Sequence, residues 1–208
     1  METKDDNLIF TIKPDWVSWE AVVDCYRQSH EVNNQHGFKM MAQYMTAEEL
    51  QDDMRDGVCF VALKGNNIIG TASVKYERFN KWWCIGRKVA YLCHAGIISD
   101  YQGSAVFWGL YKIRDKYIKE SGVKISQLRT SEYNDTVIKL NMMRGFKCVQ
   151  YSPTCKGADY YTVTMVRWEG GCPYSERFVK FMYNLSKFVA KTFWTSEYKF
   201  KYWYNRKE

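Results

Sequence analysis

The segment from Ile97 to Phe107 has the residue types of a phosphate-binding turn. An apolar run that ends at Ile98 leads through Ser99–Ser104, where small and polar residues predominate, into a helical pattern. The first turn of a helix presents backbone N–H groups at the positive end of the helix dipole, so it attracts phosphate oxygens. A residue without a side chain, such as Gly103, lets a ligand approach the backbone closely. Taken alone, such a segment is more often an ordinary connection between a strand and a helix.

A second motif follows one helix further along the chain. Asn134 is a residue type that caps helices, and the helical pattern after it closes with Gly145 and Phe146. With this motif, the sequence resembles the GCN5-related N-acetyltransferase superfamily. In that family the acetyl-coenzyme A turn follows the fourth strand and reads as a valine, a short polar stretch and Arg/Gln-x-x-Gly-x-Gly/Ala. A later helix often begins with Asn and ends in Gly-Phe.

The resemblance covers roughly residues 8–168. Ile97 stands at the family's valine, and Gln102 stands at its Arg/Gln position. The later helix keeps the family register without a gap at Asn134, Val137, Leu140, Gly145 and Phe146. The chain departs from the pattern at Ala105 and Phe107, which replace the middle glycine and the final Gly/Ala, and the Phe107 ring is expected to crowd the turn. It also departs at Asn141, where many members carry the tyrosine that protonates the departing thiolate.

The resemblance implies an α/β (α+β) fold of the acyl-CoA N-acyltransferase type, with a mixed, mostly antiparallel central sheet flanked by helices. It also implies acetyl-coenzyme A as co-substrate and no metal. The pantetheine arm is then expected to pair with backbone groups of Ile97 and Ile98 between the fourth and fifth strands. The pyrophosphate is expected on the backbone N–H groups of Gln102, Gly103, Ser104, Ala105, Val106 and Phe107. Asn134 either reaches the pantetheine arm or only caps its helix.

Direct transfer of an acetyl group to an amine needs a base for the amine proton and a group that polarises the thioester carbonyl. The candidates for this chemistry are Tyr91, His94 and Glu77. Strand alternation places Tyr91 on the same face as Ile97 and points His94 the other way. Because the family's fourth strand carries a bulge near the site, alternation does not exclude His94. Each candidate also has an ordinary structural role: His94 as a core histidine, Tyr91 as a sheet aromatic and Glu77 as a surface charge.

An acyl-enzyme on Cys93 is disfavoured, because no histidine and Asp or Asn partner has the spacing that would activate the thiol. Selection of the amine is expected to fall to the irregular segments 30–44 and 76–83. In the second of these, Phe79, Trp82 and Trp83 either line an acceptor pocket or cover the sheet.

Hydrophobic periodicity predicts the elements that position these residues, in the order β-α-α-β-β-β-α-β-α-β-β. Strands are expected at residues 8–12, 58–63, 68–76, 89–98, 125–131, 146–151 and 160–168. Asp15 is expected to cap a first helix that starts at Trp16, and Thr46 opens a second with a capping-box signature. Two further helices are expected over 104–120 and after Asn134.

Composition excludes several classes of protein. The chain has 208 residues, of which 46% are apolar and 17% aromatic, so general disorder is excluded. No stretch approaches the roughly 20 apolar residues of a membrane span, and the first residues lack the pattern of a secretory signal. Seven cysteines without a C-x-x-C pair indicate free thiols and a cytoplasmic location rather than a disulfide or zinc framework.

Charge and aromatic content set the C-terminal part apart. Residues 170–208 hold eight basic and three acidic side chains, a net of +5 within the chain's total of +7. Gly170 and Gly171 therefore mark the expected boundary between an acetyltransferase-like domain, 1–169, and a basic aromatic extension, 170–208. Twelve of the chain's 35 aromatic residues lie in the extension, which favours docking onto the body or homodimerisation.

The sequence thus predicts an acetyl-coenzyme A-dependent N-acetyltransferase that acts on a primary amine of a small molecule or a peptide. One alternative is a catalytically degenerate binding protein of the same fold. The other is a protein that binds nucleic acid or a membrane surface through the extension. This last possibility ranks third, because residues 1–169 carry a net charge of only 22 − 20 = +2.

Overall fold

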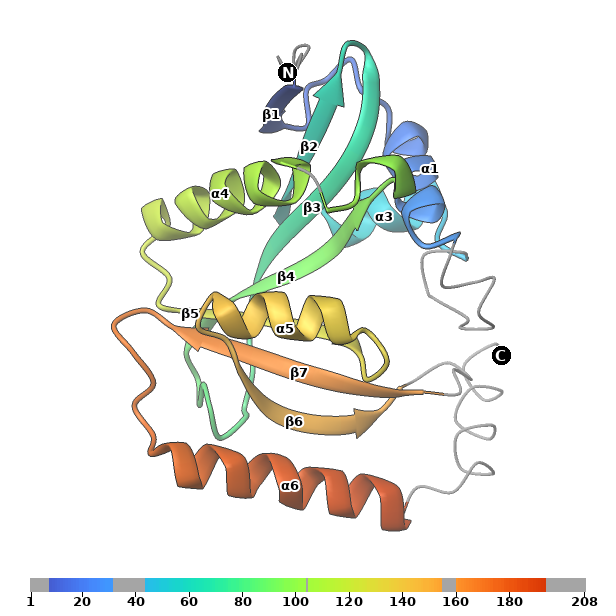
Figure 1. Cartoon of the computed structure of the whole chain (residues 1–208). Coiled ribbons are helices and arrows are strands. Elements are labelled where there is room, and N and C mark those ends of the chain that lie inside the picture. Colours follow the sequence, from blue (N-terminus) through green and yellow to red (C-terminus); the bar gives the residue numbers. More distant parts are fainter. Residues whose placement is uncertain (1–7, 32–43, 104, 155–159, 194–208) are drawn as a thin grey trace, which may run out of the picture. The chain divides into compact units, whose positions relative to one another are not determined.

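The structure is a computed structural model that describes residues 8–31, 44–103, 105–154 and 160–193 (Figure 1). The strands within these residues are β1 (Leu8–Ile12), β2 (Gly57–Lys64), β3 (Asn67–Arg78), β4 (Lys88–Ile97), β5 (Ile125–Ser131), β6 (Lys147–Pro153) and β7 (Tyr161–Trp168). The α-helices are α1 (Trp19–Ser29), α3 (Ala47–Asp53), α4 (Ala105–Glu120), α5 (Asp135–Met143) and α6 (Glu176–Phe193). The predicted order of elements and the mixed, mostly antiparallel sheet with flanking helices are confirmed.

The chain forms two compact units. The first holds β1, β2, β3 as far as Glu77, β4 from Ala90 onward, and helices α1, α3 and α4. The second holds the segment Arg78–Val89, strands β5, β6 and β7, and helices α5 and α6. None of the described helices is long and apolar enough to cross a bilayer.

In the first unit the strand order is β1-β2-β3-β4, and different helices cover the two faces of the sheet (Figure 1). α4 covers one face, where a Cβ at Gly70 would stand only 3.0 Å from Leu110 Cδ1. Helices α1 and α3 cover the other face and share an apolar core with β2. The core side chains there are Val17, Val22, Val23, Leu50, Met54, Cys59, Val61 and Leu63. The opposite faces follow from strand alternation, since Phe60 contacts α4 through Tyr117 while Val61 faces α1 and α3.

The starts of the first two helices show how far local signals reach. Thr46 caps α3 with a full capping box: its Oγ1 accepts from the Glu49 N–H, and its own N–H donates to the Glu49 carboxylate. The prediction for α1 was wrong, because the helix begins at Trp19 and its cap is Ser18, not Asp15. The N–H of Val17 donates to the carbonyl of Pro14, so Asp15 lies inside a turn that precedes the helix.

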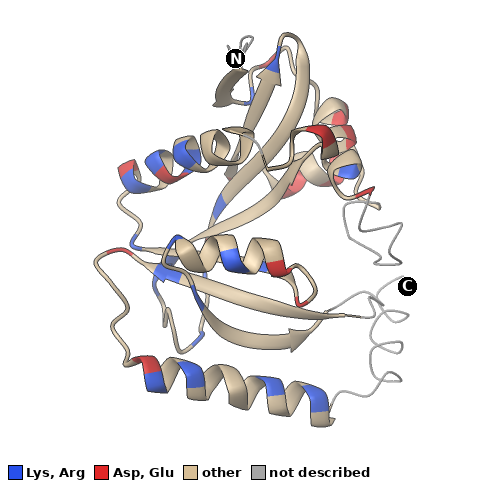
Figure 2. Cartoon of the chain, in the orientation of Figure 1, with Lys and Arg blue, Asp and Glu red and all other residues tan. Residues whose placement is uncertain are grey.

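In the second unit the strand order is β5-β7-β6, with antiparallel pairing throughout. The Arg78–Val89 segment is anchored there, because Trp83 is only 3% exposed and its Nε1 donates to Gln127 Oε1 at 2.8 Å. Phe79 and Trp82 pack against the same core, so the three aromatic residues cover the sheet, the second of the two predicted roles. Helix α6, with basic residues along its length, packs against β6 (Figure 2).

Candidate active site

The turn after β4 keeps the geometry of a strand-to-helix connection. The N–H of Ile98 donates to Ile69 of β3, and a single 3₁₀ turn follows at Ser99–Tyr101. Gly103 has a φ of +75°, which favours glycine, and a Cβ there would have no neighbour within 4 Å. The backbone is therefore open to a ligand beside the start of α4, the feature that a diphosphate needs. Ser104, also predicted to contact the phosphates, lies outside the described residues.

Gln102 braces this turn. Its side-chain Nε2 donates to the Ile97 carbonyl at 2.9 Å and to the Ser29 carbonyl at 3.4 Å, while its backbone N–H donates to Ser99. The backbone N–H of Gln102, one of those predicted to hold pyrophosphate, is thus already paired within the protein.

The Phe107 ring packs against a neighbouring side chain of α4. It is half-buried and lies against the ring of Tyr111 in the next turn, with 4.1 Å between ring centroids. The Phe107 ring, which departs from the family pattern, therefore lies partly along the surface of α4.

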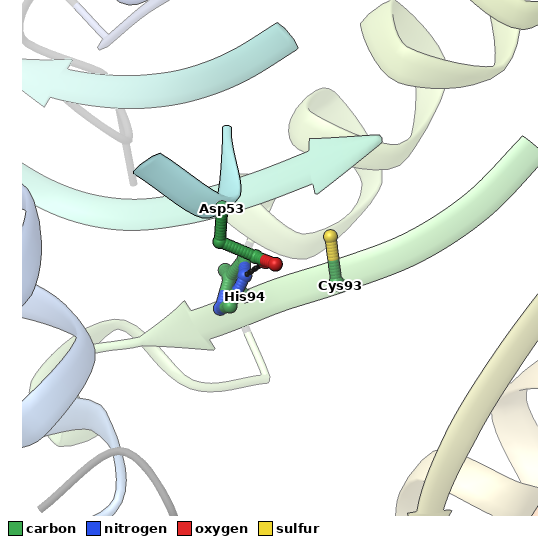
Figure 3. Close-up of side chains that lie close together, drawn as sticks. All are labelled: Asp53, Cys93 and His94. Carbon is green, nitrogen blue, oxygen red and sulfur yellow. Dashed lines mark hydrogen bonds and ion pairs between the residues drawn. The ribbon is translucent and has the colours of Figure 1, made fainter. Parts of the chain in front are cut away.

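Strand β4 breaks its alternation at His94. The φ of His94 is +46°, a left-handed conformation that residues with side chains rarely adopt. The Thr71 hydroxyl donates to the His94 carbonyl at 2.8 Å and so holds this conformation. As a result Cys93 and His94, neighbours in the chain, both lie beside Asp53 (Figure 3).

Asp53 and His94 form a close pair. Asp53 ends α3, and its Oδ2 lies 2.7 Å from Nε2 of His94, whose side chain is only 10% exposed. The hydrogen bond with His94, helped by Lys75, holds the pKa of Asp53 well below its usual value. Because an ionised carboxylate only accepts hydrogen bonds, Nε2 of His94 carries a proton. Its Nδ1 is buried and has no hydrogen-bond partner among the described residues.

Lys75 connects this pair to the other predicted candidates. Its Nζ lies 2.8 Å from Asp53 Oδ1 and 2.9 Å from Glu77 Oε1, and 5.7 Å from the centroid of the Tyr91 ring. Burial alone would lower the pKa of Lys75, but the hydrogen bonds and charges of Asp53 and Glu77 outweigh it and raise the pKa above its usual value. Tyr91, His94 and Glu77 are thus brought into one network, in which the Glu77 carboxylate is already paired.

Helix α1 closes over His94 from another side. The Tyr26 ring meets the His94 ring edge-on at 5.8 Å and the His30 ring at 4.9 Å. Burial lowers the pKa of His30. Helix α1 can approach β4 closely because Gly96 has no side chain. A Cβ at Gly96 would stand 2.8 Å from the Cβ of Ser29.

Sequence reasoning missed Asp53, Lys75 and Tyr26. Lys75 had a detectable signal, because it stands two positions before Glu77 on the same strand face. Asp53 had none, since 41 positions separate it from His94.

Cys93 is partly buried, and removal from water raises the pKa of its thiol to about 12. Its thiol is therefore protonated at neutral pH, which weighs against a nucleophilic role. The spacing in the sequence showed no sign of a histidine and aspartate near Cys93, but the fold brings Asp53 and His94 beside it.

Two asparagines of α5 have structural roles. Asn134 caps the helix, since its Oδ1 accepts from the Val137 N–H at 3.3 Å, as one of its two predicted roles requires. Asn141 is 0% exposed, donates to the Val137 carbonyl and accepts from Arg144, both at 2.8 Å. Because its amide is engaged by Val137 and Arg144 and carries no readily ionised proton, Asn141 does not replace the family tyrosine as a proton donor.

A hollow of about 630 Å³ lies between α1 and the turn that joins β2 to β3. Ile98 and Tyr101 border it, whereas Asp53, Lys75 and His94 do not. The hollow therefore adjoins the turn before α4 and does not adjoin the Asp53–His94 pair.

No protein-family model matches the sequence, and no curated protein is detectably similar to it. Several solved structures share the fold. The Arabidopsis thaliana NAA60 protein, solved with a bisubstrate analogue, aligns with a TM-score of 0.61 and 16% identity over 79% of this chain and 99% of its own. The ribosomal-protein-S18-alanine N-acetyltransferase from Escherichia coli aligns with a TM-score of 0.60 and 11% identity, over 82% of this chain and 97% of its own. A probable acetyltransferase from Staphylococcus epidermidis aligns with a TM-score of 0.61 and 10% identity, over 78% of this chain and 99% of its own.

Proposed function

We propose that this chain, whose fold is that of the GCN5-related N-acetyltransferases, transfers an acetyl group from acetyl-coenzyme A directly to a primary amine of a small molecule or a peptide. The observation that carries the proposal is the Asp53–His94 pair at the break in β4. The same strand ends three residues later in the open turn before α4, so one element positions both the base and the phosphate-binding turn.

The residues at the turn fit the co-substrate. Gly103 leaves its backbone uncovered, and the 16-residue helix α4 directs its positive end toward the same place. When bound, acetyl-coenzyme A supplies a thioester whose carbonyl carbon accepts the amine and whose sulfur departs.

His94 takes the amine proton at Nδ1, a buried atom that the amine or one bridging water reaches once the side chains over it move aside. Asp53 fixes the tautomer that leaves this nitrogen free, and its charge stabilises the imidazolium that forms. Tyr91, on the same strand, returns a proton to the departing sulfur. Glu77 is a positioning residue, because it holds Lys75 against Asp53.

Calorimetry with acetyl-coenzyme A, followed by thiol release with a broad panel of amines and peptide N-termini, tests the proposal. Micromolar binding and thiol release with at least one amine are expected. Absence of binding at high micromolar concentration would contradict it.

The buried Asn141, which is hydrogen-bonded to Val137 and Arg144 where many members of the family carry a tyrosine, favours a second candidate, a binding protein of this fold without turnover. Tight coenzyme A binding together with no thiol release from any amine would favour this candidate.

We further propose that the protein forms a homodimer through α6. One face of this helix leaves large apolar side chains exposed: Phe178, Phe181, Leu185, Phe188 and Val189. Such a stripe needs cover. In a two-fold dimer, antiparallel α6 helices would bring Glu176 of each copy toward the basic end of the other at Lys191.

A further inference from the structure

Three side chains of different donor type meet at the break in β4. Asp53, Cys93 and His94 each offer one atom, a carboxylate oxygen, a thiol sulfur and an imidazole nitrogen, and these atoms all lie within 4.8 Å of one another (Figure 3). Nothing in the acetyl transfer described above requires Cys93.

We propose that Asp53, Cys93 and His94 form a binding site for a zinc ion. Zinc takes nitrogen, sulfur and oxygen ligands together in tetrahedral geometry, and sites with three protein ligands keep the fourth position open. Bond lengths of about 2.0–2.3 Å place such donors roughly 3.3–3.7 Å apart. The Asp53–His94 contact at 2.7 Å therefore has to open slightly, and Asp53, the most exposed of the three residues at 37%, is the side chain that we expect to turn.

The backbone holds the three residues in place before any ion arrives. The left-handed conformation of His94 brings adjacent residues to one side, and Thr71 fixes it through the His94 carbonyl. Cys93 packs against the apolar core under α1 and α3. Asp53 ends a helix whose start is tied by the Thr46 capping box. A preorganised donor set binds a metal without a large cost of ordering.

With zinc bound, the charges around the site nearly balance. Asp53, Glu77 and the Cys93 thiolate contribute three negative charges, and Lys75, the zinc ion and the buried Arg114, whose charge acts on Cys93, contribute four positive ones. Lys75 is already paired with both carboxylates, so its charge is offset before the ion binds. Because thiol and imidazole must lose protons to become ligands, binding releases protons and strengthens as the pH rises.

Zinc at this site would occupy the pair that the proposed function assigns to the amine proton. If the proposed function is correct, zinc is a reversible inhibitor of acetyl transfer. The binding of zinc does not itself depend on the proposed function.

Titration of the chelator-treated full chain with Co²⁺ tests the site. Co²⁺ takes the place of zinc and gives thiolate-to-metal and tetrahedral absorption bands. One equivalent is expected to produce these bands, and one equivalent of zinc to abolish them. Cys93→Ser should remove the thiolate band, and His94→Gln and Asp53→Asn should weaken binding at least tenfold.

Cys148→Ser and Asp52→Asn are the matched controls, because Cys148 lies in the second unit and Asp52 pairs with Arg55 at the surface. Both are expected to bind Co²⁺ like the parent, and circular dichroism checks that every variant is folded. A thiolate band that survives in folded Cys93→Ser, or no band at millimolar Co²⁺, would overturn the site. Bands without amine turnover would support the site while the proposed function fails, and turnover without bands would do the reverse.

Discussion

Asp53 Oδ2 lies 2.7 Å from His94 Nε2, although the two residues are 41 positions apart. The contact exists because His94 adopts a φ of +46°, a conformation that costs free energy and persists only where surrounding contacts impose it. Those contacts come from Thr71 on β3 and Tyr26 on α1. Backbone strain and a paired imidazole thus coincide at one position of β4.

Asp53→Asn is expected to lower kcat for amine acetylation by roughly 10- to 100-fold, because His94 loses the group that fixes its tautomer, and His94→Gln by about 100-fold or more. Steady-state thiol release measures both. Asp52→Asn, a change of the neighbouring surface carboxylate, should leave kcat within twofold. Equal losses in the Asp52 and Asp53 variants would contradict the assigned role.

The Asp53 pair should make stability depend on acidity. Since the pKa of Asp53 is lowered in the folded protein, its stabilising effect is complete above the ordinary carboxyl pKa of about 4 and is lost as the pH falls below that. The melting temperature of Asp53→Asn should therefore lie below that of the parent at pH 7, and the difference should shrink toward pH 3. A difference that is constant between pH 7 and pH 3 would count against this linkage.

Gly96→Ala should destabilise the protein by about 2 kcal/mol or more, because the added methyl group would overlap Ser29. Urea unfolding measures the loss. Ser29→Gly removes the opposing atoms, so the double variant should be more stable than the sum of the two single effects. Strict additivity would mean that α1 does not pack on β4 at Gly96.

Arg114→Met should raise stability by about 1 kcal/mol or more. Arg114 is 1% exposed, and its Nε and Nη2 have no hydrogen-bond partner in the described part of the chain, although its guanidinium lies 4.4 Å from the Tyr111 ring. Removing a buried charge that is poorly satisfied relieves its desolvation cost. Arg55→Met serves as a surface control. A loss of stability in Arg114→Met, measured by thermal unfolding, would show that the guanidinium has a partner.

If the proposed dimer forms through α6, Leu185→Glu should convert it to a monomer, because the substitution places a charge at the centre of the exposed α6 stripe. Light scattering coupled to size exclusion reads the mass directly. Lys180→Glu changes charge on the neighbouring polar side and should leave the dimer intact. A monomeric parent at high micromolar concentration would refute the dimer.

Local signals in the sequence specified most elements. Thr46 and Asn134 are caps because their side chains satisfy amides three residues away, and β5 spans the predicted 125–131. The start of α1 was misplaced because Asp15 and Ser18 are both good caps, and only the turn at Pro14 decides between them. Segments 32–43 and 194–208, where an acceptor loop and part of the extension were predicted, lie outside the described residues.

The sequence by itself determined the alternating strands, the capped helices and the strand–turn–helix that carries the family resemblance, because each depends on interactions between residues close in the chain. Only the tertiary structure decided which side chains meet at His94. Asp53 reaches it from the end of α3 and Lys75 from β3, and a single left-handed residue overrides the alternation that the sequence implies. Contacts across 41 and 22 positions depend on packing of the whole unit, which no local pattern encodes.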